Sequence, residues 1–265
     1  MMLLVAVRPV DRLSGQQQRS QSAPNWPCGG RLDPSYFNIA EGSGGQLLLL
    51  APDELAGAAP LLTALSDHPQ TIFRLAGAIS PGPHDFSIPI DSSVESVVFS
   101  LAVQCLQEAV VLTPSGLPAS GPGVTDLTSF RAERLVIVPH PEAGTWKVRI
   151  TGSGVSGVVA QAKSSIGLTR VAFSSGADDF HALPIAGKEN RVSVTVGRVK
   201  GPITGAIVNG AFREVAALTF ESSDAPSTFV ARFTPGPGGF RVVVRGTDAS
   251  GAPFQRVSAA LLTAR

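Results

Sequence analysis

The stretch AGTWKVRITGSGVSGVVAQAKSSIGLTRVAF, residues 143–173, decides the fold of this chain. Apolar and polar side chains alternate along its first part, with Trp146, Val148 and Ile150 on one face and Lys147, Arg149 and Thr151 on the other. We expect a Gly/Ser hairpin turn at residues 152–157, a second strand over residues 158–162 and a third ending at Phe173. Such alternation is typical of an antiparallel sheet with one face on a core. As the largest side chain of the stretch, Trp146 is expected in that core.

The composition is that of a folded, lightly charged protein. Of the 265 residues, 43% are hydrophobic and 15% are charged, which argues against wholesale disorder. The length allows about two domains. A net charge of +1 gives no field that would attract nucleic acid or an anionic membrane. The 28 glycines and 21 prolines fit many short strands joined by tight turns.

The N-terminal segment shows little periodicity. Residues 8–31 are rich in Gln, Ser and Pro, and we expect residues 1–35 to be disordered. The initial MMLLVAV is about half the length of a signal-peptide core, and no window reaches the roughly 18 apolar residues of a membrane span. Either the chain is cytosolic, or it is a fragment whose true N-terminus lies elsewhere. Cys28 and Cys105 lie in segments expected to belong to different units, and the sequence leaves their pairing open.

Residues 36–80 have the pattern of a β–α unit. Residues 46–50 are a continuous apolar run, as in a strand buried on both faces. Asp53 is the expected N-cap of a helix that reaches about Leu65, and Pro60 should kink or shorten that helix. A buried strand followed by a helix is typical of the last unit of a parallel-sheet domain.

After a turn at residues 80–85 (SPGPHD), the pattern predicts strands only. The first series of candidates covers residues 86–90, 94–103, 109–113, 134–138, 145–151, 158–162 and 169–173. The second series covers residues 192–199, 203–208, 216–220, 228–233, 240–245 and 256–262. Their spacing predicts β-sandwiches over residues 84–174 and 178–265, with a boundary near residues 174–182. The expected fold class is therefore mainly β, with two consecutive antiparallel β-sandwiches after the β–α unit and the disordered N-terminus.

Several strings carry a resemblance to a known family. FSIPIDSSVESVVFSL (86–101), VVLTPSG (110–116) and PHPEAGTWKVRITGSGVSGVVAQAKSSI (139–166) resemble the segment that follows the von Willebrand factor A domain in hemicentins and related extracellular A-domain proteins. GGFRVVVRGTDASGAPFQRVSAALL (238–262) is similar to a later part of that segment. FNIAEGSGGQLLLLAPDEL (37–55) resembles the last strand and helix of the A domain itself.

The resemblance covers about residues 36–265 and implies a secreted protein of the extracellular matrix or of cell adhesion. It implies an A-domain remnant over residues 36–80, a galactose-binding-like or jelly-roll-like domain, and an immunoglobulin- or fibronectin-like last domain. The Asp-x-Ser-x-Ser metal motif of the A domain is missing. Its nearest match is Asp91-Ser92-Ser93-Val94-Glu95, where Glu95 replaces the second Ser. We interpret this string as an Asx/Ser turn before a strand and carry over no metal ligands.

No group of residues predicts catalysis. The four histidines, His68, His84, His140 and His181, are scattered, and we expect solvated loop positions for them. Ser156 lies in a glycine-rich stretch, but a strand follows where a nucleophile elbow requires a helix. We therefore assign no catalytic and no cofactor-binding residue.

The binding candidates are weak. Asp178 and Asp179 could bind calcium at the domain junction, with Glu142 or Asp224 as further ligands, although a solvated linker is the favoured interpretation. Arg131, Arg134, Lys147 and Arg149 could offer a basic face to a glycosaminoglycan, but alternation along a sheet puts such residues on its wet side in any case. A sugar-stacking role for Trp146 is disfavoured for the same reason.

The sequence predicts a non-catalytic extracellular structural or adhesion module. Rigid β-sandwiches would present loops such as residues 115–129 to protein or glycan partners of the matrix, without nucleic acid, membrane insertion or a cofactor. A carbohydrate-binding module is one alternative. A hydrolase with a dispersed active site is another, and it requires a nucleophile in contact with one of the four histidines.

Overall fold

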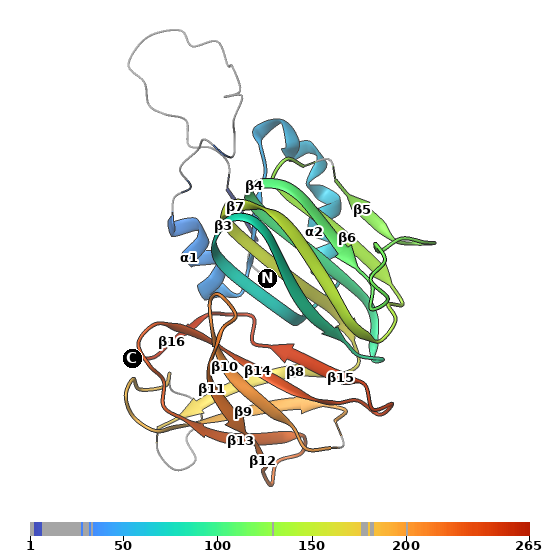
Figure 1. Cartoon of the computed structure of the whole chain (residues 1–265). Coiled ribbons are helices and arrows are strands. Elements are labelled where there is room, and N and C mark those ends of the chain that lie inside the picture. Colours follow the sequence, from blue (N-terminus) through green and yellow to red (C-terminus); the bar gives the residue numbers. More distant parts are fainter. Residues whose placement is uncertain are drawn as a thin grey trace, which may run out of the picture.

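The computed structural model describes residues 3–6, 28, 32, 34–128, 130–175, 180, 183–199 and 201–265 (Figure 1). It has three parts, namely an N-terminal α/β layer, a first β unit with very long strands, and a second β unit at the end of the first. Antiparallel sheets dominate, so the mainly β fold expected from the sequence is confirmed.

The N-terminal layer begins as a strand–helix–strand unit. Strand β1 (Leu3–Ala6) pairs in parallel with β2 (Gln46–Leu49), and helix α1 (Pro34–Ser43) lies between them in the chain. The expectation of disorder throughout residues 1–35 is therefore wrong for β1, because this apolar run pairs its backbone groups with a buried strand. Apart from Cys28, Leu32 and the start of α1, the remainder of that segment lies outside the described residues.

The helical segment after β2 is split in two. A 3-10 helix (Pro52–Gly57) has Ala51 rather than Asp53 at its N-cap, and the Glu54 carboxylate accepts the Ala51 N–H at 2.6 Å. Helix α2 (Ala59–Ser66) follows, with Pro60 in its first turn, where the missing N–H breaks no hydrogen bond. The expected helix is thus shortened to a start at Ala59, just before Pro60, and is not kinked there.

The first β unit is a single antiparallel sheet with the strand order β3-β7-β4-β6-β5. The strands are β3 (Gln70–Ile90), β4 (Val94–Leu112), β5 (Thr125–Leu127), β6 (Glu133–Pro139) and β7 (Gly144–Ser164). β4 and β7 each replace two of the shorter strands expected from the sequence. The chain enters the sheet already at Gln70, and the expected SPGPHD turn lies inside β3.

The hairpin turn expected at residues 152–157 is wrong, because these residues continue β7. A Cβ on Gly152 would lie 2.6 Å from the carbonyl oxygen of Cys105 on β4, so only glycine lets the two strands come this close. Gly154 has a φ of +91°, and the strand pairing shifts register beside both glycines. The glycines therefore bend the strand instead of reversing it.

Bending brings the two ends of the long strands face to face around one core. The rings of Trp146 and Phe99 stack with centroids 5.9 Å apart, although Phe99 pairs within the sheet with Ala160, near the other end of β7. One sheet thus supplies both layers of the sandwich. Its five strands differ from the eight strands of the jelly roll that the resemblance implied.

The second β unit is a sandwich of two antiparallel sheets. One sheet has the order β12-β13-β9-β8, and the other has the order β11-β10-β14-β15, with β16 also on β14. The strands are β8 (Gly167–Ser174), β9 (Asn190–Gly197), β10 (Thr204–Asn209), β11 (Glu214–Thr219), β12 (Glu221–Ser222), β13 (Thr228–Phe233), β14 (Gly239–Thr247), β15 (Pro253–Val257) and β16 (Leu262–Thr263). With β8 taken as strand A, the order of the strands is similar to an ABED sheet on a CFG sheet, with β11 as an added edge strand.

The boundary between the β units lies at Ser165 and Ile166, not near residues 174–182. β8 pairs with β9, so it belongs to the second unit. Only two residues separate β7 from β8, and the alternating pattern therefore runs across the boundary without a visible break. Ile166 already packs in the second core.

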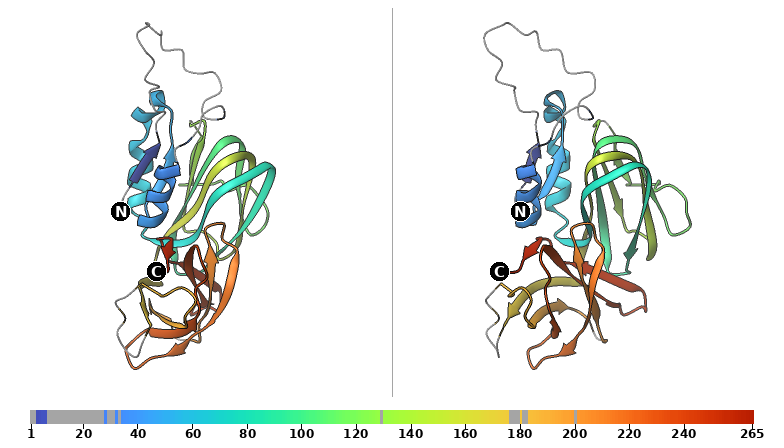
Figure 2. Two further views of the ribbon diagram at one scale, coloured as in Figure 1. Left: turned by 90° about the vertical axis from the view of Figure 1, so that its left-hand side faces the viewer. Right: turned by 60° about the vertical axis from the view of Figure 1, so that its left-hand side comes forward.

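The α/β layer covers one face of the first sheet, and the second unit lies at the end of that sheet (Figure 2). Leu48 of β2 and Leu61 and Leu65 of α2 pack against Val98 and Leu135 of the sheet. No helix in the described part of the chain is long and apolar enough to span a membrane.

Candidate functional site

The junction between the two β units is the candidate functional site. β15 of the second unit runs beside β3 of the first unit. The Gln255 side-chain amide donates a hydrogen bond to the Ile72 carbonyl at 2.9 Å, and the rings of Phe73 and Phe212 pack 4.4 Å apart. The two units therefore contact each other directly. The chain passes from β7 to β8 through two residues and not through an extended linker.

A fully buried ion pair crosses the junction. Asp91 follows β3 in the first unit, Arg256 lies on β15 in the second, and both side chains are 0% exposed. Arg256 Nη1 donates to Asp91 Oδ2 at 2.8 Å, Nη2 donates to the Ser164 hydroxyl at 2.6 Å, and Nε donates to the Ile166 carbonyl at 2.9 Å. Both charges are thus compensated away from water.

The turn that holds Asp91 is the expected Asx/Ser turn. Asp91 Oδ1 accepts the Ser93 N–H at 3.1 Å and also the Ser93 hydroxyl. Glu95 instead pairs with Lys163 at 2.9 Å. Asp91 is the first residue of the string that most resembles the metal motif, and its carboxylate therefore accepts hydrogen bonds from the protein itself.

A second carboxylate contact lies nearer the surface. Asp248, in the turn between β14 and β15, accepts the Ser92 N–H at 2.8 Å and the Ser92 hydroxyl at 2.6 Å from the first unit. The Ser250 hydroxyl donates to the same carboxylate at 2.7 Å. Desolvation opposes ionisation of Asp248, but the hydrogen bonds from Ser92 and Ser250 outweigh it and lower the pKa of this carboxyl.

A buried cluster joins all three parts of the molecule. Glu41 on α1 lies between Arg74 on β3 and Arg241 on β14. Arg74 Nη2 donates to Glu41 Oε1 at 2.8 Å, and Arg241 Nη2 donates to Glu41 Oε2. Desolvation lowers the pKa of Arg241, with Glu41 opposing and Arg74 adding to the shift. One carboxylate thus pairs with guanidinium groups from both β units.

This arrangement can fix an orientation. A charge removed from water is tolerated only while its partner stays in place, so any hinge motion would leave uncompensated charges. The carboxylates of Glu41, Asp91 and Asp248 all accept hydrogen bonds from the protein itself.

The calcium candidates do not converge. Asp178 and Asp179 lie outside the described residues. Glu142 lies between β6 and β7 in the first unit, whereas Asp224 lies between β12 and β13 in the second. Within the described ranges, no group of three or more His, Cys, Asp or Glu side chains is placed to hold a metal ion.

His68 contradicts the expectation of solvated histidines. It is buried just after α2, where its Nδ1 donates to the Ala64 carbonyl at 2.6 Å, so its Nε2 accepts the Ser96 hydroxyl at 2.8 Å. Ser96 lies 28 residues away on β4, too far along the chain for local sequence to reveal the contact. His140 is exposed in a loop, as expected. His84 is partly exposed, but it lies within β3 and not in a loop. His181 lies outside the described residues.

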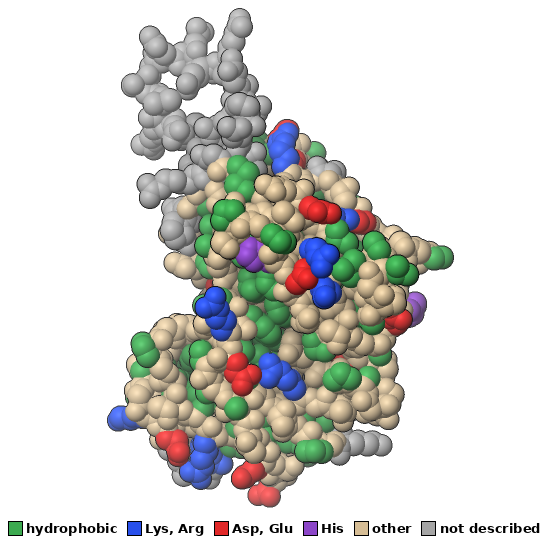
Figure 3. All heavy atoms as spheres, viewed as in Figure 1, with side chains coloured by type: hydrophobic (Ala, Val, Ile, Leu, Met, Phe, Trp, Pro, Cys, Tyr) green, Lys and Arg blue, Asp and Glu red, His purple; other side chains and the backbone are tan. Residues whose placement is uncertain are grey.

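The four basic residues do not form a free basic face. Each of them forms an ion pair with a nearby carboxylate. Arg131 pairs with Asp53 at 2.6 Å, and Arg134 pairs with Asp126 at 2.5 Å. Arg149 and Lys147 share the carboxylate of Asp85, at 2.8 Å and 3.9 Å. Figure 3 shows basic and acidic side chains next to each other on one face of the first unit. These pairs support the wet-face interpretation over a glycosaminoglycan site.

Trp146 lies in the core, as expected. Its side chain is 2% exposed, and Nε1 donates to the Glu142 carbonyl at 2.9 Å, which removes it from consideration as an exposed sugar platform. The expected recognition loop, residues 115–129, begins as a loop and then includes β5; Ser129 lies outside the described residues. Leu117 in this loop is 66% exposed.

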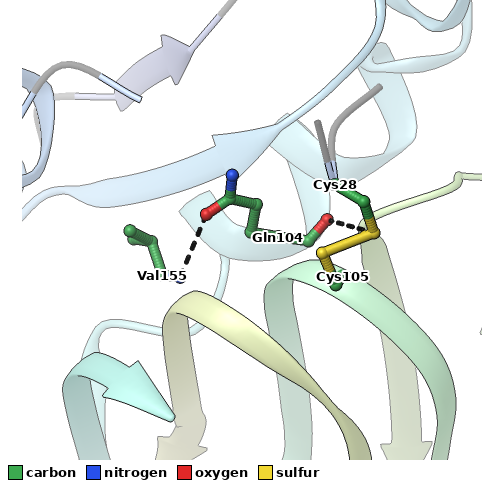
Figure 4. The surroundings of a disulfide bond; sticks show 4 residues. All are labelled: Cys28, Gln104, Cys105 and Val155. Atoms are coloured by element: carbon green, nitrogen blue, oxygen red, sulfur yellow. Dashed lines mark hydrogen bonds between the residues drawn. A yellow bond between two sulfur atoms is a disulfide. The ribbon is translucent and has the colours of Figure 1, made fainter. Parts of the chain in front are cut away.

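A disulfide joins Cys28 to Cys105 (Figure 4). Cys105 lies at the bend of β4, beside Gln104, whose side-chain oxygen accepts the Val155 N–H of β7 at 3.3 Å. The bond closes a sequence separation of 77 residues and ties the segment between β1 and α1 to the first sheet.

The residues that build the junction were missed in the sequence, although a signal was present. Arg74, Arg241 and Arg256 each lie within an apolar strand run, in TIFRLAG (71–77), GFRVVV (239–244) and PFQRV (253–257). A charge inside such a run indicates a buried ion pair, because burial requires a partner. The partners lie 33 to 200 residues away, and no local pattern points to them.

The comparisons with known proteins do not show a family. No family model matches the chain, and no curated protein matches it significantly. Similar solved structures include the Bacillus licheniformis lipase BlEst2 in its propeptide form, with 11% identity over 71% of this chain and 40% of that chain, and a TM-score of 0.36. Bifidobacterium dentium β-glucuronidase has 10% identity over 67% of this chain and 39% of that chain, with a TM-score of 0.25.

Dictyoglomus thermophilum β-D-glucuronidase is a further similar structure, with 8% identity over 67% of this chain and 36% of that chain, and a TM-score of 0.24. The chain therefore spans at most 40% of the length of these three proteins. Similarity at this level carries no argument about function.

Proposed function

We propose that this chain is a non-catalytic extracellular structural or adhesion module that holds recognition loops at a fixed distance and angle. The observation that carries the proposal is the charged junction, where Asp91 pairs with Arg256, and Glu41 pairs with Arg74 and Arg241. Interfaces between domains of one chain usually permit relative motion. Buried charges contributed from both sides oppose such motion, because bending the junction would unpair them.

The disulfide supports an extracellular site of action. Disulfides persist in oxidising compartments and are rare in the cytosol. We expect peptide mapping of the unreduced protein by mass spectrometry to recover a Cys28–Cys105 cross-link. Two free thiols in protein exported to an oxidising compartment would count against this part of the proposal.

The N-terminal layer is compatible with a relation to hemicentins and other von Willebrand factor A domain proteins. A parallel β1–β2 pair connected through a helix is the repeating unit of doubly wound α/β sheets. We propose that this layer is the last part of an A-like domain, and that the two β units are modules that follow it.

The loop after β4 is the proposed recognition element. Its ends are fixed, since Thr113 N donates to the Leu117 carbonyl at 2.8 Å and Ala119 N donates to the Val111 carbonyl at 2.8 Å. Leu117 is therefore an exposed apolar side chain on an ordered loop, which suits an apolar pocket on a protein partner.

Adhesion of chain-coated beads to immobilised extracellular matrix tests this function. We expect Leu117→Ser to weaken adhesion by about tenfold, which corresponds to about 1.4 kcal/mol, a plausible contribution from one apolar anchor. The matched control is Val215→Ser on β11, where the native side chain is 61% exposed, and it should leave adhesion unchanged. No adhesion by the wild type would contradict the adhesion role, and equal adhesion by both variants would contradict presentation by this loop.

A hydrolase is the second candidate, because Ser96 contacts His68 at the distance of a nucleophile and its base. Two hollows of the described part of the chain are a cleft between the two β units and a depression lined by residues of β8, β9, β11, β12 and β13, and neither Ser96 nor His68 lines them. Both ring nitrogens of His68 are engaged, and the imidazole is buried. We therefore expect no hydrolysis of activated esters. Activity that disappears in Ser96→Ala would establish the hydrolase instead.

A further inference from the structure

A cleft with a volume of about 550 Å³ lies where the two β units meet. One of its walls is the edge strand β8, with residues 168–173 along the cleft. Residues 257–260, from the end of β15 onward, form another wall, and Gln70 and Thr71 of β3 contribute from the first unit. Leu168, Leu183 and Leu262 make part of the lining apolar.

On the side of β8 that faces the cleft, the backbone groups of Val171 and Phe173 have no hydrogen-bond partner among the described residues. The Thr195 carbonyl on β9 faces β8, where it accepts the Thr169 hydroxyl at 3.3 Å, and Thr195 pairs with Arg170. Successive residues of a strand turn their N–H and C=O groups to opposite sides. Val171 and Phe173 therefore direct these groups away from β9, and both residues line the cleft.

Two side chains of the cleft could also form polar contacts with a ligand. The hydroxyl of Thr71 is buried and has no hydrogen-bond partner in the described part of the chain, and Thr71 lines the cleft. Arg170 also lines the cleft, is exposed, and forms no ion pair with a described residue. Leu168 shows how this edge accepts a partner, since its N–H already donates to the Gln70 side-chain oxygen at 3.0 Å.

We propose that this cleft binds an extended peptide segment by addition of a strand to the free edge of β8. The peptide backbone would bond to the N–H and C=O groups of Val171 and Phe173, which are two residues, or about 7 Å, apart along the edge. Alternate apolar side chains of the peptide would contact the apolar lining. An acidic side chain would pair with Arg170, the cationic residue of the cleft.

A peptide fits this site better than other ligand classes. The free N–H and C=O groups of an edge strand recur at every second residue. The backbone of an extended polypeptide has its own N–H and C=O groups at the same spacing, so it can bond to the edge along its whole length. The edge is recessed between walls from both units, and this geometry suits a single segment rather than the folded edge of a second copy. Self-association through β8 is therefore an outcome that counts against the proposal.

The site goes beyond the proposed function, because it assigns binding to a strand edge away from the loop at residues 115–129. The inference rests on the proposed function in one respect, because the walls of the cleft come from both β units. The tests below use the intact, oxidised chain. These tests measure peptide binding to the cleft and not the angle between the units. A negative result would therefore contradict the peptide site but not the rigid junction.

The probe is a set of fluorescein-labelled hexapeptides of alternating Val and Thr, with a single Asp moved through every position. Fluorescence anisotropy should detect saturable binding for at least one Asp position. N-methylation of the alternate residues that face β8 should weaken that binding by about tenfold or more, because it removes the bonding N–H groups, whereas N-methylation in the other register should change it by less than about twofold.

Charge reversal provides the second arm. Arg170→Glu should weaken binding of the best hexapeptide by about tenfold, and the matched control Arg213→Glu, on an exposed turn of the same unit, should leave it unchanged. Nitrogen–proton NMR spectra should show the largest shifts at the Val171 and Phe173 amides. No saturable binding below about 1 mM for any hexapeptide would overturn the proposal. Equal effects of both N-methyl registers, or dimerisation of the free chain through β8, would also overturn it.

Discussion

At the scale of single residues, five buried charges hold the parts of the molecule together. Glu41, Arg74, Asp91, Arg241 and Arg256 are each at most 5% exposed. Loss of one partner from a buried ion pair costs about 3 to 5 kcal/mol, because the remaining charge stays in a medium that solvates it poorly. Exposed ion pairs contribute far less, since water and salt screen them. Single neutral substitutions therefore separate the two classes of ion pair.

Asp91→Asn tests the buried pair at the junction. The substitution keeps the side-chain shape but leaves the Arg256 guanidinium without its counter-charge, so we expect the free energy of unfolding to fall by about 3 to 5 kcal/mol. Urea unfolding measures this change. Asp85→Asn is the control, because it breaks only exposed pairs, with Arg149 and Lys147, and should have little effect. Equal losses in the two variants would contradict the role given to burial.

Glu133 is a buried carboxyl group without a cationic partner. It lies at the start of β6, where its Oε1 accepts the Ser100 hydroxyl at 2.8 Å and its Oε2 has no partner among the described residues. Desolvation raises the pKa of Glu133 to about 8, and hydrogen bonds from Ser100 and the Leu49 backbone only partly oppose that shift. The folded protein therefore holds this group protonated at neutral pH.

This pKa predicts a stability that declines as the pH rises. In the unfolded chain the pKa of Glu133 is near its ordinary value of 4.5, so between pH 4.5 and about 8 the unfolded state has lost a proton that the folded state retains. The contribution of Glu133 to the free energy of unfolding is therefore greatest below pH 4.5 and decreases between pH 4.5 and about 8. At 1.36 kcal/mol per pKa unit, the total decrease is about 5 kcal/mol.

Glu133→Gln should remove this part of the pH dependence, because the amide does not titrate. Free energies of urea unfolding at pH 5 and pH 8 measure it in both proteins. A Gln variant with the same decline as the wild type would show that Glu133 is not the responsible group.

At the scale of elements, the short strands could be predicted and the long ones could not. The expected ranges 134–138 and 228–233 match β6 (Glu133–Pro139) and β13 (Thr228–Phe233) closely, since turn residues bound them on both sides. The sequence predicts two strands in place of β7, because glycine-rich sequences are compatible with both a turn and a bend. The choice depends on the Cys105 carbonyl across the sheet, which the local sequence does not contain.

The glycines of β7 provide a matched pair of substitutions. Gly152→Ala places a Cβ 2.6 Å from the Cys105 carbonyl oxygen, and we expect a loss of about 1 to 3 kcal/mol from the resulting strain. Gly157→Ala adds a Cβ in open space on the same strand and should leave the stability unchanged or slightly higher. Thermal unfolding compares the two, and equal melting temperatures would contradict the bend described for Gly152.

At the scale of the whole molecule, the sequence predicts how many β units exist but not how they are joined. Alternation continues from β7 into β8, so the sequence pattern predicts a domain boundary that lies too late in the chain. The orientation of the units depends on contacts such as Arg241 with Glu41, which are 200 residues apart. Apolar runs that contain an arginine indicate that a partner exists, and only the folded chain shows which carboxylate it is.

The angle between the two β units in solution tests the central claim most directly. Residual dipolar couplings of backbone N–H groups in β4 and β7 of the first unit, and in β9 and β14 of the second, report the alignment of each unit in the intact oxidised chain. The junction of buried charges predicts that one alignment tensor fits both sets of couplings to the orientation seen here. Two tensors of different magnitude would show that the units move independently, and would contradict the account.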